Sequence, residues 1–199
     1  MPHQTEERRY HHGGLRAALL EAAERSVRDH GVAQLSLRDL AREVGVSHAA
    51  PRRHFADRQE LLTALAEVGF ARLGQDIRGA LAETPDEFCA RLRGAASAFA
   101  HFATGNPALL ELMNSTKHHP EAPGVARASD EAFAPILALI SEGQQRGLLR
   151  EGDPQEAGLI LFATVNGITT LVNTGLVPAG RLDHLIATAV DLFLRGSAP

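Results

Sequence analysis

Apolar residues recur every three or four positions along most of the chain, which is the period of amphipathic helices. The first apolar stripe ends at Gly31, where a helix stops with a left-handed residue, and Gly45 and Gly147 follow two later segments in the same way. The pattern predicts an all-α protein. The predicted helices span residues 13–30, 37–44, 48–54, 58–82, 85–104, 107–113, 125–146, 154–174 and 181–194.

Several of these helices begin at residues that cap a helix N-terminus. Ser36 precedes Asp39 by three residues and Asp57 precedes Glu60 by three, which is the spacing of a capping box. Thr84 is followed by Pro-Asp-Glu and offers an N-cap with a proline in the first turn. We therefore expect helices to begin directly after these capping residues.

Composition agrees with a helical chain and narrows the class of protein. The 199 residues include no Trp and one Tyr, so strand-forming residues are scarce, and the length suits one large domain or two small ones. The single cysteine, Cys89, excludes an internal disulfide framework and a cysteine-based zinc site. Residues 1–14 hold no apolar segment of a secretory signal, so we expect a cytoplasmic protein.

Residues 157–180 carry no charge and are long enough to be tested as a membrane span. Asn166, Asn173 and Pro178 interrupt this stretch, and no cluster of Lys or Arg flanks it. We therefore expect no membrane association, and we interpret the stretch as a helix buried at the interface of a homodimer.

Charge is distributed unevenly along the chain. Residues 1–59 hold 10 Arg and 8 acidic residues, whereas residues 60–199 hold 10 Lys or Arg and 16 acidic residues. The first part is therefore basic within a chain of net charge −4, and six of the ten histidines also lie there. This asymmetry indicates a polyanionic partner for the N-terminal part.

The segments 37–44 and 48–54 have the lengths and the connection of a helix-turn-helix. Gly45 permits the tight turn between them, and the second segment is then placed to enter a major groove of DNA. No acidic residue occurs in residues 47–56, although Arg52 and Arg53 stand side by side there. This crowding of positive charge favours phosphate as the partner.

Residues 10–65 resemble the N-terminal DNA-binding domain of the TetR family of bacterial transcriptional regulators. The similarity is carried by Leu-Ser-Leu-Arg at 35–38, Gly-Val-Ser at 45–47, His-Phe at 54–55 and Leu-Leu at 61–62. The rest of the chain resembles the branch of that family named for a Trp-His-Gly signature, through Gly147-Leu148 and Asn166-Gly167, with Val165-Asn166 in place of Trp-His.

The resemblance implies which residues contact DNA. Arg52 replaces an aromatic phosphate contact of the family, and it either keeps that role or reaches a guanine edge. Arg58 stands where the family commonly has a phosphate-binding Lys. The expected DNA-contacting residues are Ser36, Arg38, Ser47, His48, Ala49, Arg52, Arg53, His54 and Arg58.

The resemblance also implies a division into domains and a small-molecule effector. We expect a flexible basic arm (1–12), a helix-turn-helix domain (13–60) with helix 58–82 as connector, and an effector-binding and dimerisation domain (83–199). A small, largely apolar effector is expected to release the protein from its operator, as in a repressor. The expected effector-binding residues are Phe99, His101, Phe102, Met113, Phe133, Phe162, Asn166 and Thr170.

Other classes of function are less compatible with the sequence. An enzyme is disfavoured because the chain shows no Gly-rich phosphate loop and no nucleophile elbow, so no catalytic residue or cofactor is expected. The His118-His119 pair is interpreted as a loop and not as a metal site, because adjacent histidines do not share a helix face. A helical interaction protein without DNA binding, or a transcriptional activator of the same fold, remains as an alternative.

Overall fold

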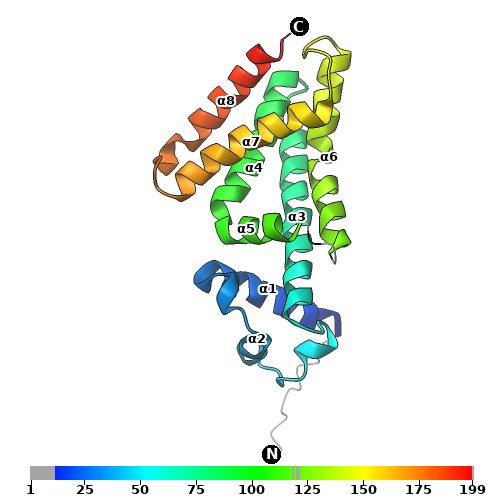
Figure 1. Cartoon of the computed structure of the whole chain (residues 1–199), viewed down its shortest axis with the longest axis vertical. Coiled ribbons are helices and arrows are strands. Elements are labelled where there is room, and N and C mark those ends of the chain that lie inside the picture. The colour runs from blue at the N-terminus through cyan, green and yellow to red at the C-terminus, as the bar shows by residue number, and fades with distance from the viewer. Residues whose placement is uncertain (1–11, 118, 120–121, 199) are drawn as a thin grey trace, which may run out of the picture. The chain divides into compact units, whose positions relative to one another are not determined.

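The computed structural model describes residues 12–117, 119 and 122–198 (Figure 1), and this part of the chain is helical without a β-strand, which confirms the predicted all-α class. The long elements are α1 (His12–His30), α2 (Leu37–Val44), α3 (Arg58–Glu83), α4 (Phe88–Gly105), α5 (Pro107–Thr116), α6 (Pro123–Gln145), α7 (Pro154–Asn173) and α8 (Leu182–Gly196). Three short 3-10 turns accompany them: η1 (Val32–Gln34), η2 (Pro51–Arg53) and η3 (Ala179–Arg181).

The chain forms two compact units, one within residues 1–65 and the other within residues 66–199. Unit one contains α1, α2 and the first turns of α3, which enclose a small apolar core. Leu19, Leu40, Phe55 and Leu61 are fully buried in it. The Arg16 guanidinium lies over the Phe55 ring, 5.3 Å from its centroid, and closes one edge of this core.

Unit two is a bundle made of the remainder of α3 and of α4 to α8. Helices α4, α7 and α8 pack on one another, and α6 packs on α4 and α7. Arg91 of α4 and Arg146 after α6 both reach Glu142 of α6, and the hydrogen bond from Arg146 is the main reason why the pKa of the Glu142 carboxyl lies below its usual value. The fully buried large side chains are Phe70, Leu73, Ile77, Leu92, Met113, Leu139 and Ile140.

Helix α7 is long and apolar enough to cross a membrane by length and composition, and it is the one such helix in the part of the chain that the structure describes. It begins as the sequence predicts, because Asp153 accepts a hydrogen bond from the Gln155 amide at 2.9 Å. Only 22% of its most apolar window is buried within the chain. An exposed apolar helix surface of this kind is typical of an interaction site.

The predicted helix 48–54 is wrong as an α-helix: the segment is a turn followed by η2. An α-helix would need the amide of residue 51 to donate to the Ser47 carbonyl, but Pro51 has no N–H. The Ser47 carbonyl accepts from Ala50 instead, at 2.9 Å, and His54 donates to the Pro51 carbonyl at 2.9 Å. The segment therefore winds more tightly, with bonds three residues apart.

The predicted start of the helix 85–104 is also wrong, because α4 begins at Phe88. The Thr84 hydroxyl donates to the Ala80 carbonyl at 2.6 Å and so completes the end of α3 instead of capping α4. The Glu87 amide donates to the Pro85 carbonyl in a tight turn. Ser36 does occupy the N-cap of α2, but its side chain makes no capping hydrogen bond to the described backbone.

Candidate nucleic-acid interface and ligand cavity

A left-handed glycine shapes the turn after α2 in unit one. Gly45 has φ +77° and donates to the Arg42 carbonyl at 3.2 Å, and the next amide, that of Val46, donates to the Ala41 carbonyl at 2.9 Å. These two bonds close the end of α2. The chain then turns sharply into residues 47–54, as the sequence predicts for this glycine.

Residues 47–55 form a short basic surface on an apolar base. Pro51 and Phe55 are buried and fix the segment to the core of unit one. Arg52 and Arg53 are exposed between them, and neither makes an ion pair with a described side chain. The segment thus presents two uncompensated positive charges from a fixed backbone, which is the arrangement that a phosphate-binding surface needs.

The structure distributes the other predicted DNA-contacting residues over unit one. Ser47, His48 and Ala49 are exposed in the turn beside Arg52, and His54 is half-buried. Arg38 and Ser36 belong to the start of α2, where Arg38 is exposed and Ser36 is half-buried. Their contacts with DNA stay a prediction. Residues 1–11 of the predicted basic arm (1–12) lie outside the described residues, and His12 begins α1.

Arg58 has a different environment from the other candidate DNA contacts. Its Nε donates to the Leu35 carbonyl at 3.0 Å and one terminal nitrogen donates to the Val32 carbonyl at 2.5 Å. Two of its donors therefore bind the segment between α1 and α2. No local pattern in the sequence marks this role, because it depends on two carbonyl groups more than 20 residues away.

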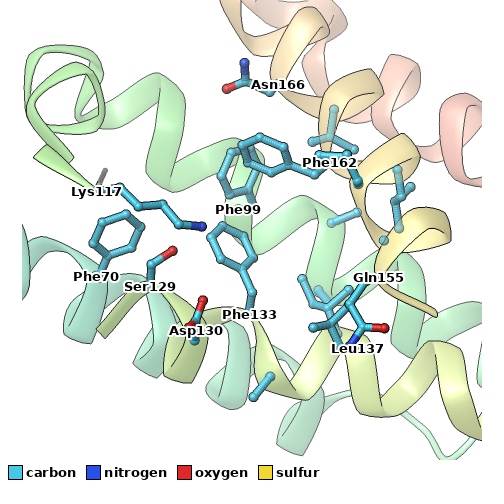
Figure 2. A pocket seen from close by; sticks show the side chains of 18 of the residues that line it. Phe70, Phe99, Lys117, Ser129, Asp130, Phe133, Leu137, Gln155, Phe162 and Asn166 are labelled. Atoms are coloured by element: carbon cyan, nitrogen blue, oxygen red, sulfur yellow. The ribbon is translucent and has the colours of Figure 1, made fainter. Parts of the chain in front are cut away.

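Unit two contains a cavity of about 850 Å³ between α3, α4, α5, α6 and α7. Three aromatic rings meet in its wall (Figure 2): the centroid of Phe99 lies 5.3 Å from that of Phe162 and 6.0 Å from that of Phe133, and Phe133 and Phe162 are 5.6 Å apart. Such a volume with an aromatic lining is typical of a small-molecule site.

Four predicted effector-binding residues line this cavity: Phe99, Phe133, Phe162 and Asn166. Four others lie elsewhere. His101 is exposed, with its Nε2 2.8 Å from an Asp183 oxygen, and Thr170 is exposed, with its hydroxyl bonded to the Asn166 carbonyl. Phe102 packs beneath the Arg72 guanidinium, and Met113 is fully buried against Gly69.

The cavity also has polar lining residues that the sequence interpretation missed. They are Asn114, Lys117, Ser129, Asp130 and Gln155. Lys117 follows α5 and was included in a predicted loop, so nothing in the helical pattern marked it. One available signal was its rarity, because Lys117 is the single lysine of the chain.

No group of three or more side chains that could hold a metal ion occurs among the described residues. His118 lies outside these residues, so the interpretation of the His118-His119 pair is not tested.

Two known families match this chain. Residues 19–65 match the family described as "Bacterial regulatory proteins, tetR family", and residues 92–193 match "Tetracyclin repressor-like, C-terminal domain". The second match alone covers about half of the chain, and together the two matches include most of both units.

Relatives of the chain carry names of the same kind. The chain is 32% identical over 140 residues to the HTH-type transcriptional regulators Rv1816 of Mycobacterium tuberculosis and Mb1846 of Mycobacterium bovis, a match that covers 66% of this chain and 60% of theirs. A solved protein of unknown function from Rhodococcus sp. RHA1 is 42% identical, with a TM-score of 0.89, and the match covers 97% of this chain and 100% of that one.

The regulator PfmR of Thermus thermophilus is 25% identical to this chain, with a TM-score of 0.69, and the match covers 89% of this chain and 97% of PfmR. The matched families comprise transcriptional regulators and not enzymes, which confirms the prediction from the sequence that disfavoured an enzyme. From its helix-turn-helix domain and its matched C-terminal domain, the chain belongs to the TetR family of bacterial regulatory proteins.

Proposed function

We propose that the chain is a homodimeric transcriptional repressor that binds an operator in double-stranded DNA and leaves it when an effector enters the cavity of unit two. The observation that carries DNA binding is the basic surface of residues 47–55, where Arg52 and Arg53 are exposed without a described acidic partner. Family membership and the basic composition of the N-terminal part support the same function.

The homodimer is supported by one face of α7. Six exposed residues recur at helical spacing along it and none is charged: Ile160, Ala163, Thr164, Gly167, Thr170 and Leu171. Leu192 of the neighbouring α8 is 58% exposed as well. A second copy of the chain would cover this surface through a two-fold interface. The apolar face of α7 is then explained by a dimer and not by insertion into a membrane.

The cavity supports an effector-dependent mechanism. In a dimer bound to successive major grooves, the two DNA-binding segments must stand about 34–36 Å apart. An effector that binds more tightly to a dimer with another separation shifts the population away from DNA, and by linkage DNA weakens effector binding by the same factor. We assign the C-terminal domain to the Trp-His-Gly branch and place the protein in the cytoplasm, where such a regulator meets DNA.

The test of DNA binding is a salt titration of Arg52→Ala and Arg53→Ala. DNA affinity is measured by fluorescence anisotropy on a duplex selected by the protein from random sequence and on an unselected duplex. Loss of a phosphate contact weakens both duplexes alike and reduces the salt slope by about 1, whereas loss of a base contact costs about 1–3 kcal/mol on the selected duplex alone. Either result supports the proposal.

Arg127→Ala is the matched control, because it removes the same charge from an exposed position of α6 in unit two. We expect its DNA affinity and salt slope to equal those of the parent. Unchanged affinity in both single variants and in the double variant would contradict the assignment of this surface. A parent protein without steep salt dependence would instead favour a helical interaction protein.

A further inference from the structure

The cavity of unit two has a polar end formed by Lys117, Ser129 and Asp130. Figure 2 shows Lys117 reaching past Phe70 into the cavity, with its amine toward Phe99 and Phe133. The Ser129 hydroxyl points to the same region from α6. A cation just after α5 and a hydroxyl of α6 thus face one space.

The positive charge of Lys117 has no protein partner in the described residues. Lys117 is half-buried at the C-terminal end of α5, and no carboxylate among these residues forms an ion pair with it. It is also the one lysine beside 19 arginines in the chain. An unpaired cation in a partly enclosed apolar space is costly, and a bound anion would relieve that cost.

Ser129 provides an independent observation. Its side chain is 0% exposed, and its hydroxyl is the one buried side-chain polar atom without a hydrogen-bond partner in the part of the chain described. Hydroxyls in these helices usually bond to the carbonyl four residues earlier, as Thr104 does with Ala100 and Thr116 with Leu112. Ser129 makes no such bond, so its hydroxyl is an unsatisfied donor at the wall of the cavity.

Asp130 is the competing charge in the lining. Its side chain is exposed at the edge of the cavity, where water screens the carboxylate. Lys117 is less exposed, and its charge is therefore screened less. The electrostatic preference inside the cavity is consequently set by the lysine.

We infer that the cavity binds an amphipathic organic anion. Its head group accepts hydrogen bonds from the Lys117 amine and the Ser129 hydroxyl, and its apolar body packs on Phe99, Phe133 and Phe162. This inference rests on the proposed function, because it names the chemical class of the effector. It replaces the expected anchors His101 and Thr170, which lie outside the cavity.

The experiment compares three probes that differ only in the head group: octanoate, 1-octanol and octylamine. Binding to the full chain is measured by calorimetry at neutral pH without DNA. We expect octanoate to bind at least about tenfold more tightly than 1-octanol, and octylamine to bind most weakly. Equal affinities, a preference for octylamine, or no saturable binding of any probe would overturn the inference.

Variants locate the preference within the cavity. Lys117→Met should bring octanoate and 1-octanol to within about threefold of each other, whereas Lys117→Arg should retain the preference. Ser129→Ala should weaken octanoate by about fivefold and leave 1-octanol unchanged, since it removes one hydrogen bond to a charged group. Arg127→Met removes a charge from the exposed side of the same helix as Ser129 and should change neither affinity.

The single lysine allows a second measurement on the parent protein. An N-hydroxysuccinimide ester of acetate modifies the Lys117 amine, and mass spectrometry of the peptide that contains it gives the rate. Octanoate should slow this modification several-fold, while 1-octanol at equal occupancy should slow it less. Equal protection of Lys117 by both probes would contradict the role of the lysine. So would a calorimetric preference for octanoate over 1-octanol that persists in Lys117→Met.

Failure of this inference and failure of the proposed function give different results. If octanoate is not preferred over 1-octanol and octylamine, the ligand class is wrong. The DNA affinity and salt dependence of the parent are measured separately, so the proposed DNA binding is not affected by that result. Octanoate that binds as expected but leaves DNA affinity unaltered contradicts the proposed effector role and retains the ligand class.

Discussion

At the scale of single residues, the fixed geometry of arginine decides how the segment between α1 and α2 is held. Arg58 donates from two nitrogens of one planar guanidinium to the carbonyls of Val32 and Leu35. Both carbonyls lie between Gly31 and α2, in a short segment that also has backbone hydrogen bonds of its own, from Gln34 to Gly31 and from Leu35 to Val32. Arg58 therefore fixes two carbonyls of the segment that leads into α2, which begins at Leu37.

We expect Arg58→Lys to lower the free energy of unfolding of unit one by about 1–3 kcal/mol, although it keeps the charge, because an ammonium cannot reproduce the two parallel bonds. Urea unfolding and hydrogen exchange of the α2 amides measure the loss. The control is Arg28→Lys, at an exposed position near the end of α1, which should change stability by less than about 0.5 kcal/mol. If Arg58→Lys retains full stability, the two carbonyl contacts are not what holds the segment.

At the scale of elements, the sequence predicted helices wherever apolar spacing and a local cap agreed. The long helix from Asp57 is an example: the Glu60 amide donates to the Asp57 carboxylate at 2.8 Å, and the Glu60 carboxylate accepts from the Ala56 amide at 2.5 Å. One prediction was wrong because a residue had two possible partners, and the helix 48–54 was wrong because Pro51 lacks an N–H. Thr84 resembles an N-cap in sequence, but its hydroxyl completes the helix before it.

The cavity was also predicted only in part from the sequence. Its apolar wall was predictable, since Phe99, Phe133 and Phe162 follow the helical period of three different elements. Its polar end was not, because Lys117 and Ser129 come from two separate segments that meet only at the cavity in the folded chain. His101 was expected from its position beside these aromatic residues, yet one helical step turns it outward to Asp183.

The turn after α2 depends on a backbone conformation that only glycine adopts at low cost. Gly45→Ala should destabilise the protein by about 1–2 kcal/mol, because φ +77° brings the new Cβ close to its own backbone although no other atom lies within 4 Å. Gly79→Ala is the matched comparison, since Gly79 lies within α3, also with open space around it.

The same substitution at Gly79 should stabilise by about 0.5–1 kcal/mol. Urea unfolding of both variants measures the difference, and effects of equal sign would contradict the conformational argument.

At the scale of the whole molecule, α7 connects the cavity and the proposed subunit interface. One side of the helix carries Phe162 and Asn166 into the cavity, and the opposite side presents the uncharged exposed face. Gly158 belongs to the inner side, because a Cβ there would meet Leu137 at 2.8 Å, whereas Gly167 is open to solvent. A ligand that shifts α7 would thereby alter the surface on which the proposed second copy packs.

The proposed interface predicts that a charge on this face separates the dimer. Leu171 is 41% exposed, so Leu171→Glu should leave the 21.3 kDa chain folded. In a two-fold interface the substitution buries two unpaired carboxylates, and we expect dimerisation to weaken by at least about a hundredfold. Sedimentation equilibrium measures the mass, and affinity for a duplex with two half-sites should fall as the dimer dissociates.

Leu148→Glu is the control. Leu148 is matched in residue type and in its 41% exposure but lies before α7, away from the proposed interface, so this variant should remain dimeric. If Leu171→Glu sediments as the parent does, or if Leu148→Glu dissociates equally, α7 does not form the interface.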